Sequence, residues 1–300
     1  MDLYRGKTSS EVEITLQRFV AIFIDALGQK NNLYELESKL LSETHDMEKL
    51  KESIDKTYSR VSSTRNGFFN YLSILTNDSQ KQSFVGCHPT FNSDFKKYMA
   101  QKVYFEHMSD SIFIYFPLNN ESDAEYNSPM LFHAILAIIL LQTKAISEGI
   151  FFRGGIDVGF GALLPEENYT TNLSLYGPVL SRVAKLEAKC AYWPRIVVGS
   201  ELCDYIKSGH LNVGTDLSRV ECLTFYHDWC NELIAYTDDF AMLKVFGEAS
   251  KKYFGSEYPD MVMKSLIEIK RNIDIAKGDA KVVERYSTLF KYILTQSGIF

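Results

Sequence analysis

The sequence carries no excess of positive charge. Its 32 lysines and arginines are outnumbered by 38 aspartates and glutamates, which gives a formal net charge of −6. Proteins that bind duplex nucleic acids do so largely through basic surface that neutralises phosphates. We therefore expect no nucleic-acid partner, and any site that handles phosphate must be local.

Cysteine is scarce, and its spacing forms no metal or redox motif. The five cysteines are an odd number, and no two of them are arranged as C-x-x-C. This pattern excludes a zinc ribbon, a thioredoxin-type motif and a secreted disulfide framework. We expect reduced, mostly buried thiols in a cytoplasmic protein.

Long apolar runs are absent as well. The first ten residues contain no apolar segment of the kind found in a secretory signal. The longest apolar run, 130–141, is interrupted by His133 and is too short to span a bilayer. It predicts a buried core helix and no association with a membrane.

What is present is a regular alternation of strand and helix patterns. Apolar runs bounded by turn residues predict strands, and apolar residues at helical spacing predict helices. The predicted strands are 18–24, 103–108, 112–116, 151–158, 173–176, 195–198 and 240–246, and the predicted helices are 33–75 (as one helix or two), 129–148, 178–191, 200–207, 261–276 and 281–295. Their order predicts an α+β fold, a split β-α-β-β-α-β antiparallel-rich sheet with flanking helices.

Two aspartates stand out by their positions. Asp25 follows the first apolar strand, and Asp110 lies at the tight turn of the predicted hairpin. In a split sheet of this kind the first strand and the hairpin are neighbours, so the two carboxylates would meet at one end of the sheet. Paired carboxylates there suit two divalent cations in phosphoryl transfer, and the amides that lead into the next helix suit phosphate. Taken singly, each aspartate is instead an ordinary cap or turn residue.

Four motifs, in order along the chain, resemble those of the class III nucleotidyl cyclases. They are F-I-D-A-L-G-Q at 23–29, S-D at 109–110, G-I-D-V-G at 155–159 and G-P-V-L-S-R-V-A-K-L-E at 177–187. In the last motif Ser181 replaces the family's ribose-binding asparagine, and Lys185 replaces its transition-state arginine. Lysine supplies charge without the bidentate fork of arginine. Arg182 and Arg153 are therefore further candidates for that catalytic role.

These departures resemble one branch, the bacterial pyrimidine cyclases of the Pycsar anti-phage defence system. The shared segments are S-D-S-I at 109–112, R-G-G-I at 153–156, Y-G-P-V-L at 176–180, L-E at 186–187, P-R-I-V at 194–197 and R-Y-S-T-L at 285–289. The resemblance implies a uridylate cyclase that converts UTP to 3′,5′-cyclic UMP and pyrophosphate with two Mn²⁺ or Mg²⁺ ions. It also implies a head-to-tail homodimer with shared active sites, and a separate effector protein that the cyclic nucleotide activates.

The same resemblance assigns the site residues and the domains. The metal ligands would be Asp25, Asp110 and the carbonyl of Ala26, and the phosphate-facing amides would be those of Leu27, Gly28 and Gln29. The domain boundaries implied are an N-terminal tail at 1–14, frayed over 1–10, a cyclase catalytic domain at 15–215, and a C-terminal strand and helical extension at 216–300 packed on the same domain. Residues 77–98 are read as an insertion.

Two positions in the resemblance concern the base. In purine cyclases the corresponding residues read the base, and here they are Glu106 and Ser174. Glu106 disfavours adenine, but a carboxylate can accept from guanine, uracil or cytosine, so the base stays open. Phe23 and Tyr58 are candidates to stack on it. The alternative is that Phe23 belongs to the core and Tyr58 to the surface.

Other functions stay open at this point. The substrate could be CTP, giving cyclic CMP, or GTP. The intact aspartate pair favours an enzyme, whereas Ser181 and Lys185 favour a non-catalytic dimer that senses nucleotide. A polymerase-like palm would share the sheet order and the carboxylates, but the acidic charge balance and the absence of a basic stripe argue against it.

Overall fold

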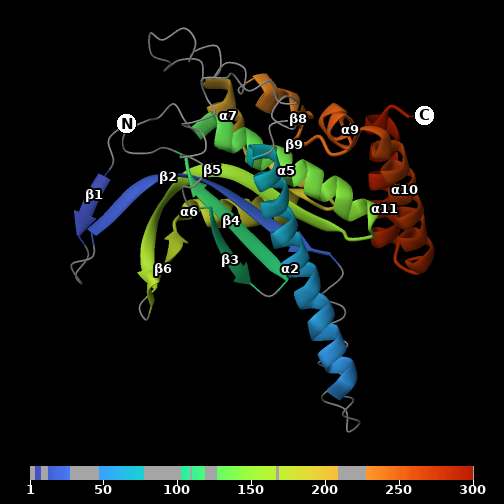
Figure 1. Ribbon diagram of the computed structural model, residues 1–300, viewed down its shortest axis with the longest axis horizontal. Helices are drawn as coiled ribbons and strands as arrows, with labels where there is room; N and C mark the ends of the chain where they lie inside the picture. Colours follow the sequence, from blue (N-terminus) through green and yellow to red (C-terminus); the bar gives the residue numbers. More distant parts are fainter. Residues whose placement is uncertain are drawn as a thin grey trace.

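The protein has an α+β fold built on one mixed, mainly antiparallel sheet. The computed structural model describes residues 4–7, 13–27, 47–77, 103–108, 110–118, 127–166, 169–208 and 228–299. Within these ranges nine strands form the sheet, in the order β3-β4-β2-β5-β7-β9-β8, with β1 paired to β2 and β6 paired to β5 (Figure 1). The predicted fold class and its β-α-β-β-α-β order are confirmed.

The centre of the sheet is β2 (Glu13–Ala26). It lies between β4 (Ser111–Pro117) and β5 (Phe152–Glu166) and is antiparallel to both. The predicted hairpin is formed by β3 (Tyr104–Met108) and β4. Side chains alternate along a strand, so Val20, Ile22 and Ile24 of β2 enter one core while Phe19 and Ala21 enter another. The two faces of the sheet are therefore covered separately.

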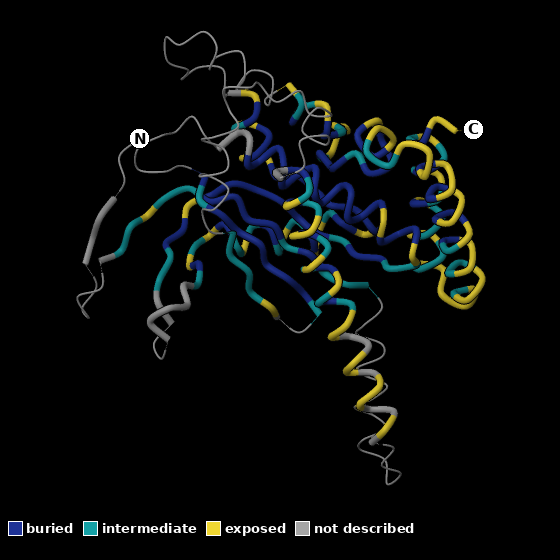
Figure 2. Tube along the Cα trace, viewed as in Figure 1, coloured by how far each residue is buried: buried dark blue, intermediate teal, exposed yellow. Residues whose placement is uncertain are grey.

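Two long helices lie over much of the first face. Every residue of α5 (Asn127–Ser147) from 130 to 143 is buried, as predicted for the apolar run. In the described part of the chain, Met130–Ser147 is the one helical stretch apolar and long enough to cross a membrane, and 94% of it is buried inside the fold, as in a core helix. The second helix, α2 (Met47–Asn77), packs on α5 through its C-terminal half, and its exposed N-terminal half projects from the body (Figure 2).

The opposite face is covered by α6 (Pro178–Cys190), which follows β6 (Tyr169–Tyr176). Val179 and Val183 of this helix pack with Phe19, Tyr115 and Leu175. The helix lies very close to β5: a Cβ at Gly155 would fall 2.5 Å from the carbonyl oxygen of Val183. Gly155, the second glycine of the R-G-G-I segment, therefore sets the distance between α6 and the sheet.

The rest of the chain extends the sheet and adds a helical layer. It comprises β7 (Ile196–Val198, parallel to β5), α7 (Ser200–Ser208), β8 (Ile234–Tyr236), β9 (Ala241–Leu243), α9 (Glu248–Phe254), a 3-10 turn (Gly255–Glu257), α10 (Tyr258–Ile275) and α11 (Ala280–Ser297). The last two helices share a second core with β9. Of the described cysteines, Cys203 and Cys230 are buried and Cys190 is partly exposed, and none of these three forms a disulfide.

Two sequence predictions were wrong, and one strand was missed. The strand predicted at 240–246 ends at Leu243, because the chain turns at 245–246 and Phe246 adopts a positive φ of 62°. Its partner β8 was not predicted, since a three-residue strand leaves almost no alternating pattern. Residues 4–7 do not fray: they form β1 (Tyr4–Lys7), which pairs antiparallel with β2. This strand is defined by its main-chain pairing with β2, and its sequence has no apolar alternation that would predict a strand.

Candidate active site

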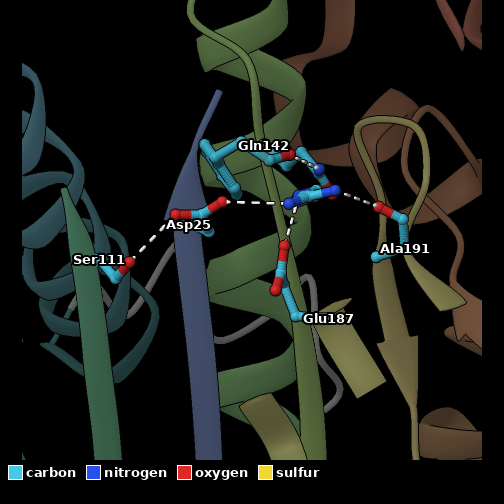
Figure 3. Close-up of polar contacts among 7 residues, drawn as sticks. Asp25, Ser111, Gln142, Glu187 and Ala191 are labelled. Carbon is cyan, nitrogen blue, oxygen red and sulfur yellow. Dashed lines mark hydrogen bonds and ion pairs between the residues drawn. The ribbon is translucent and has the colours of Figure 1, made fainter. Parts of the chain in front are cut away.

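Asp25 and Asp110 meet at one edge of the sheet. Strand β2 continues through Ala26, and the Ala26 amide donates to the carbonyl oxygen of Asp110 at 3.2 Å. The hydroxyl of Ser111 donates to Oδ1 of Asp25 at 3.0 Å (Figure 3). The hairpin and the end of β2 are therefore joined by main-chain and side-chain contacts, which is the juxtaposition that the sequence predicted.

Arg153 holds the other oxygen of Asp25. Its guanidinium lies 3.5 Å from Oδ2 of Asp25 and forms a second, closer ion pair with Glu187 of α6. The side chains of Asp25, Arg153 and Glu187 are 14%, 19% and 7% exposed. A third contact, at 3.5 Å, runs from the guanidinium to the carbonyl oxygen of Ala191 (Figure 3). One largely buried cation thus joins β2, β5 and α6, and it orients the carboxylate of Asp25.

The donor set at this edge fits hard divalent cations. Carboxylate and carbonyl oxygens are the ligands that Mg²⁺ and Mn²⁺ prefer, and Mg²⁺ commonly keeps several waters beside one or two carboxylates. Among the described residues no group of three or more His, Cys, Asp or Glu side chains could hold a metal ion. A smaller set of ligands is present here: the carboxylates of Asp25 and Asp110 and the carbonyl oxygen of Ala26. Hydrated divalent ions can use so small a set. Ser111 and Arg153 fix the orientation of the Asp25 carboxylate.

The predicted phosphate cradle is wrong at one residue. The Leu27 amide donates to the carbonyl oxygen of Phe151 at 2.9 Å, so the main-chain pairing of the strands uses the donor that was expected to face phosphate. Gly28 and Gln29, the other two residues of the predicted cradle, lie outside the described residues, as does Ser109 of the hairpin motif.

A second polar cluster lies farther along the same sheet face. The hydroxyl of Tyr115 donates to Oε1 of Glu106 at 2.6 Å, and the Leu175 amide donates to the same oxygen at 3.2 Å. The Leu175 amide also lies 3.1 Å from the Tyr115 oxygen. These contacts place the Glu106 side chain next to Leu175 of β6, the residue that follows Ser174. The two predicted base-reading positions are therefore neighbours.

The Tyr115 hydroxyl is fixed as a donor. Burial, followed by the hydrogen bond to Glu106, raises the pKa of Tyr115 well above its usual range, so the phenol stays protonated. The ring of Tyr104 stacks on that of Tyr115, with centroids 5.4 Å apart and an interplanar angle of 9°. Phe19 meets the same ring edge-on at 6.4 Å. The rings of Tyr104 and Phe19 therefore restrict the movement of Tyr115, whose hydroxyl donates to Glu106.

Helix α6 presents the remaining candidates on its exposed side. Ser181 and Lys185 are four residues apart and exposed, while Val179, Val183 and Glu187 face inward. No contact joins Ser181 or Lys185 to Asp25 within the described part of this chain. The two residues are accessible to another molecule, such as a second copy.

Arg182 forms an ion pair with Asp157 of β5. It lies 3.5 Å from Oδ2 of Asp157 and donates to the carbonyl oxygen of Val158 at 2.9 Å. Asp157 is buried, and its Oδ1 accepts from the Leu202 amide in the first turns of α7 at 2.9 Å. Burial raises the pKa of this carboxyl, and the amides of Val158 and Leu202 and the charge of Arg182 counteract part of that rise. This pair links α6, β5 and α7.

The two predicted stacking residues have different environments. Phe23 is half-buried and packs against Phe113 at 4.6 Å, between the Asp25 edge and the Glu106 cluster. Tyr58 lies on the projecting half of α2 and is 71% exposed. No contact in the described ranges joins Tyr58 to Phe23 or Glu106. The proposed stacking of Phe23 and Tyr58 on the base stays a prediction.

Sequence reasoning assigned no role to Tyr115, Asp157 or Glu187. Each had a recognisable signal. A tyrosine inside an apolar strand needs a partner for its hydroxyl, and an aspartate between isoleucine and valine needs a donor or a cation. Glu187 was part of the quoted L-E segment, but its partner, Arg153, could be found only from the packing of α6 on β5.

No family model matches the chain, and no curated protein matches it. Solved structures do. The adenylyl cyclase CyaB from P. aeruginosa is 14% identical, with 66% of this chain and 84% of that chain covered and a TM-score of 0.36. The guanylyl cyclase domain of the RhoGC fusion protein from the aquatic fungus Blastocladiella emersonii is 12% identical, with 66% and 90% covered and a TM-score of 0.38. A class III adenylyl cyclase-like ATP-binding protein from Pseudomonas aeruginosa is 11% identical, with 73% and 44% covered and a TM-score of 0.41.

Proposed function

We propose that this protein is a nucleotidyl cyclase that converts UTP to 3′,5′-cyclic UMP and pyrophosphate. The observation that carries the proposal is the contact between the ends of β2 and the hairpin, where the Ala26 amide donates to Asp110 and Ser111 donates to Asp25. Two aspartates at adjoining strand ends, one of them oriented by fixed donors, suit phosphoryl transfer assisted by two metal ions.

In this reaction the ribose 3′ oxygen bonds to the α-phosphorus while the bond from that phosphorus to pyrophosphate breaks, and the hydroxyl proton is released. Asp25, Asp110 and the Ala26 carbonyl would hold two Mn²⁺ or Mg²⁺ ions, which when bound acidify the hydroxyl and neutralise phosphate charge. Arg153 keeps Asp25 oriented toward this edge. Positioning and charge neutralisation by the chain are what such a transfer requires.

We assign the transition-state cation to Lys185. Arg153 is engaged by Asp25 and Glu187, and Arg182 is engaged by Asp157, whereas Lys185 is exposed. A head-to-tail homodimer would bring Ser181 and Lys185 of one copy to the aspartates of the other. Two equivalent sites then follow from the two-fold symmetry, and one copy alone would be inactive.

Glu106, with Ser174 beside it, would select the base. Its carboxylate accepts hydrogen bonds, which suits the N3–H of uracil and opposes the N1 acceptor of adenine. The biological role that we propose is second-messenger synthesis in the cytoplasm during antiviral defence, with a separate effector protein responding to the cyclic nucleotide. Cyclic CMP from CTP is the nearest alternative product.

A second candidate function is a non-catalytic dimer that senses nucleotide. The observation in its favour is the presence of Ser181 and Lys185 where cyclases carry asparagine and arginine. The two functions are separated by incubating the purified protein with UTP and Mn²⁺ and analysing the products by mass spectrometry. Cyclic UMP and pyrophosphate are expected in equal amounts, and saturable binding of UTP without either product would favour the sensor.

A further inference from the structure

Glu106 is not a free carboxylate. Its Oε1 receives the Tyr115 hydroxyl at 2.6 Å and the Leu175 amide at 3.2 Å. Among the residues that the structure describes, no hydrogen bond reaches Oε2. The two oxygens of this side chain are therefore inequivalent: one is used by the protein and the other is available.

The number of acceptor sites limits which base edge Glu106 can bind. A carboxylate oxygen accepts about two hydrogen bonds, so Oε1 has no site left. A carboxylate that binds guanine face-on uses both oxygens, one for N1–H and one for the N2 amino group. A single available oxygen matches instead a base edge with one donor, such as the N3–H of uracil between its two carbonyl groups.

We propose that Tyr115 is a specificity-determining positioning residue: together with the Leu175 amide it occupies Oε1 of Glu106, so that only Oε2 faces the base and uracil is selected over guanine. This inference rests on the proposed function, because it takes Glu106 as the base-reading residue. Tyr115 itself acts through Glu106 rather than on the nucleotide.

The structure gives Tyr115 the rigidity that this role needs. The residue is fully buried on β4, its ring is stacked by Tyr104, and its oxygen lies within hydrogen-bonding distance of the Leu175 amide. The amide and the hydroxyl converge on Oε1 from two different strands, β6 and β4. Rotation of the Glu106 carboxylate would break both contacts, which disfavours the face-on orientation that guanine requires.

The same donors predict how an amide would sit at position 106. In the variant Glu106→Gln, the amide oxygen would take the Oε1 place, because both the hydroxyl and the Leu175 amide donate there. The amide NH₂ group would then face the base. A donor there opposes the N3–H of uracil and suits the N3 acceptor of cytosine.

The test measures base selectivity without turnover. The probes are the 3′-deoxy triphosphates of uridine, cytidine and guanosine, which lack the attacking hydroxyl, and their affinities are measured by calorimetry with Mn²⁺. In Tyr115→Phe, the preference for the uridine over the guanosine analogue should fall by roughly tenfold or more, the scale of one hydrogen bond to a charged group. The matched control is Tyr104→Phe, which removes a hydroxyl from the neighbouring ring and should change the ratio by less than about twofold.

An unchanged ratio in Tyr115→Phe, or a wild-type protein that prefers the guanosine analogue, would overturn the inference. Glu106→Gln gives a second reading, since it should shift the preference from the uridine to the cytidine analogue by roughly tenfold. Loss of affinity for both pyrimidine analogues alike would count against the fixed orientation.

The proposed function and the inference fail separately. Selective binding with the predicted shifts, but no cyclic product from UTP, would overturn the cyclase assignment alone. Cyclisation of UTP with selectivity that Tyr115→Phe leaves unchanged would overturn the inference alone. Wild-type protein that binds none of the three analogues would overturn both.

Discussion

The guanidinium of Arg153 lies 3.5 Å from the carboxylate of Asp25, although the two residues are 128 positions apart in the sequence. The same guanidinium pairs with Glu187 of α6. The proposed metal-binding edge is therefore tied to the helix that carries the exposed Ser181 and Lys185. Arg153 sets the relative position of these two parts of the fold.

This tie makes a prediction about stability. Arg153→Ala removes the guanidinium that pairs with the buried carboxylate of Glu187, and breaking a largely buried ion pair in this way costs about 3–5 kcal/mol of the free energy of unfolding. Glu187→Gln in the same chain should recover most of the loss, because it removes the buried negative charge that Arg153 neutralises. Urea unfolding of the two variants checks this. A loss below about 1 kcal/mol in Arg153→Ala would mean that the pair behaves as a surface salt bridge.

The aspartate pair predicts a loss of catalysis without a loss of fold. Asp25→Asn keeps an acceptor for the Ser111 hydroxyl but removes one of the two charges proposed to bind metal, and Asp110→Asn removes the other charge at the hairpin. Each should lower the rate of UTP cyclisation by roughly 10³-fold or more, since metal-assisted charge stabilisation is worth several kcal/mol. The melting temperature should stay within about 4 °C of the wild type.

The control for that experiment is Asp204→Asn, an exposed aspartate on α7. It removes the same charge from the same chain and should leave the rate unchanged. Near wild-type turnover in either Asp25→Asn or Asp110→Asn, at saturating Mn²⁺, would show that the metal assignment is wrong.

The proposed head-to-tail dimer predicts complementation. Asp25→Asn and Lys185→Ala chains should each be inactive as homodimers, but a heterodimer would contain one site with both native residues. Random mixing gives heterodimers in half of the molecules, so about a quarter of the wild-type activity should return. The rate is measured after co-refolding, with heterodimer content determined by two affinity tags. Confirmed heterodimers without recovery would argue against a shared active site.

Asp157 predicts a dependence of stability on pH. Burial raises the pKa of this carboxyl above its ordinary value of 3.8. The folded chain then retains a proton that the unfolded chain has released, so the contribution of Asp157 to stability is full below pH 3.8 and is lost as the pH rises through the raised folded pKa. Each unit of elevation is worth about 1.4 kcal/mol.

Asp157→Asn keeps an acceptor for the Leu202 amide but does not ionise. Relative to the wild type it should therefore gain stability as the pH is raised from about 4 to 7. Chemical unfolding at a series of pH values measures the difference, and Asp204→Asn is again the exposed control. A difference that is constant across this range would exclude a raised pKa at Asp157.

The parts of the fold that the sequence predicted are those set by local pattern. Alternating and continuous apolar runs predicted β2, β3, β4 and β5, and the unbroken apolar run predicted α5. The meeting of Asp25 and Asp110 followed from the sheet order alone, because it depends on which strand ends adjoin rather than on side-chain packing. The structure places these strand ends together as expected.

The parts that could not be predicted depend on contacts between distant segments. Glu187 finds Arg153 only because Gly155 lets α6 approach β5. The Leu27 amide donates to the carbonyl oxygen of Phe151, and no local sequence pattern predicts this hydrogen bond. The hydrogen bond from the Tyr115 hydroxyl to Glu106 likewise joins β4 to β3, and the position of that hydroxyl is set by packing.

If this protein cyclises a pyrimidine nucleotide, it should do so when the four nucleoside triphosphates compete for its site. The wild-type protein is incubated with equal concentrations of UTP, CTP, GTP and ATP in the presence of Mn²⁺, and the cyclic products are quantified by mass spectrometry. Cyclic UMP is expected as the main product. Cyclic CMP as the main product would contradict the choice of uracil, and cyclic GMP, cyclic AMP or no cyclic product would contradict pyrimidine cyclisation itself.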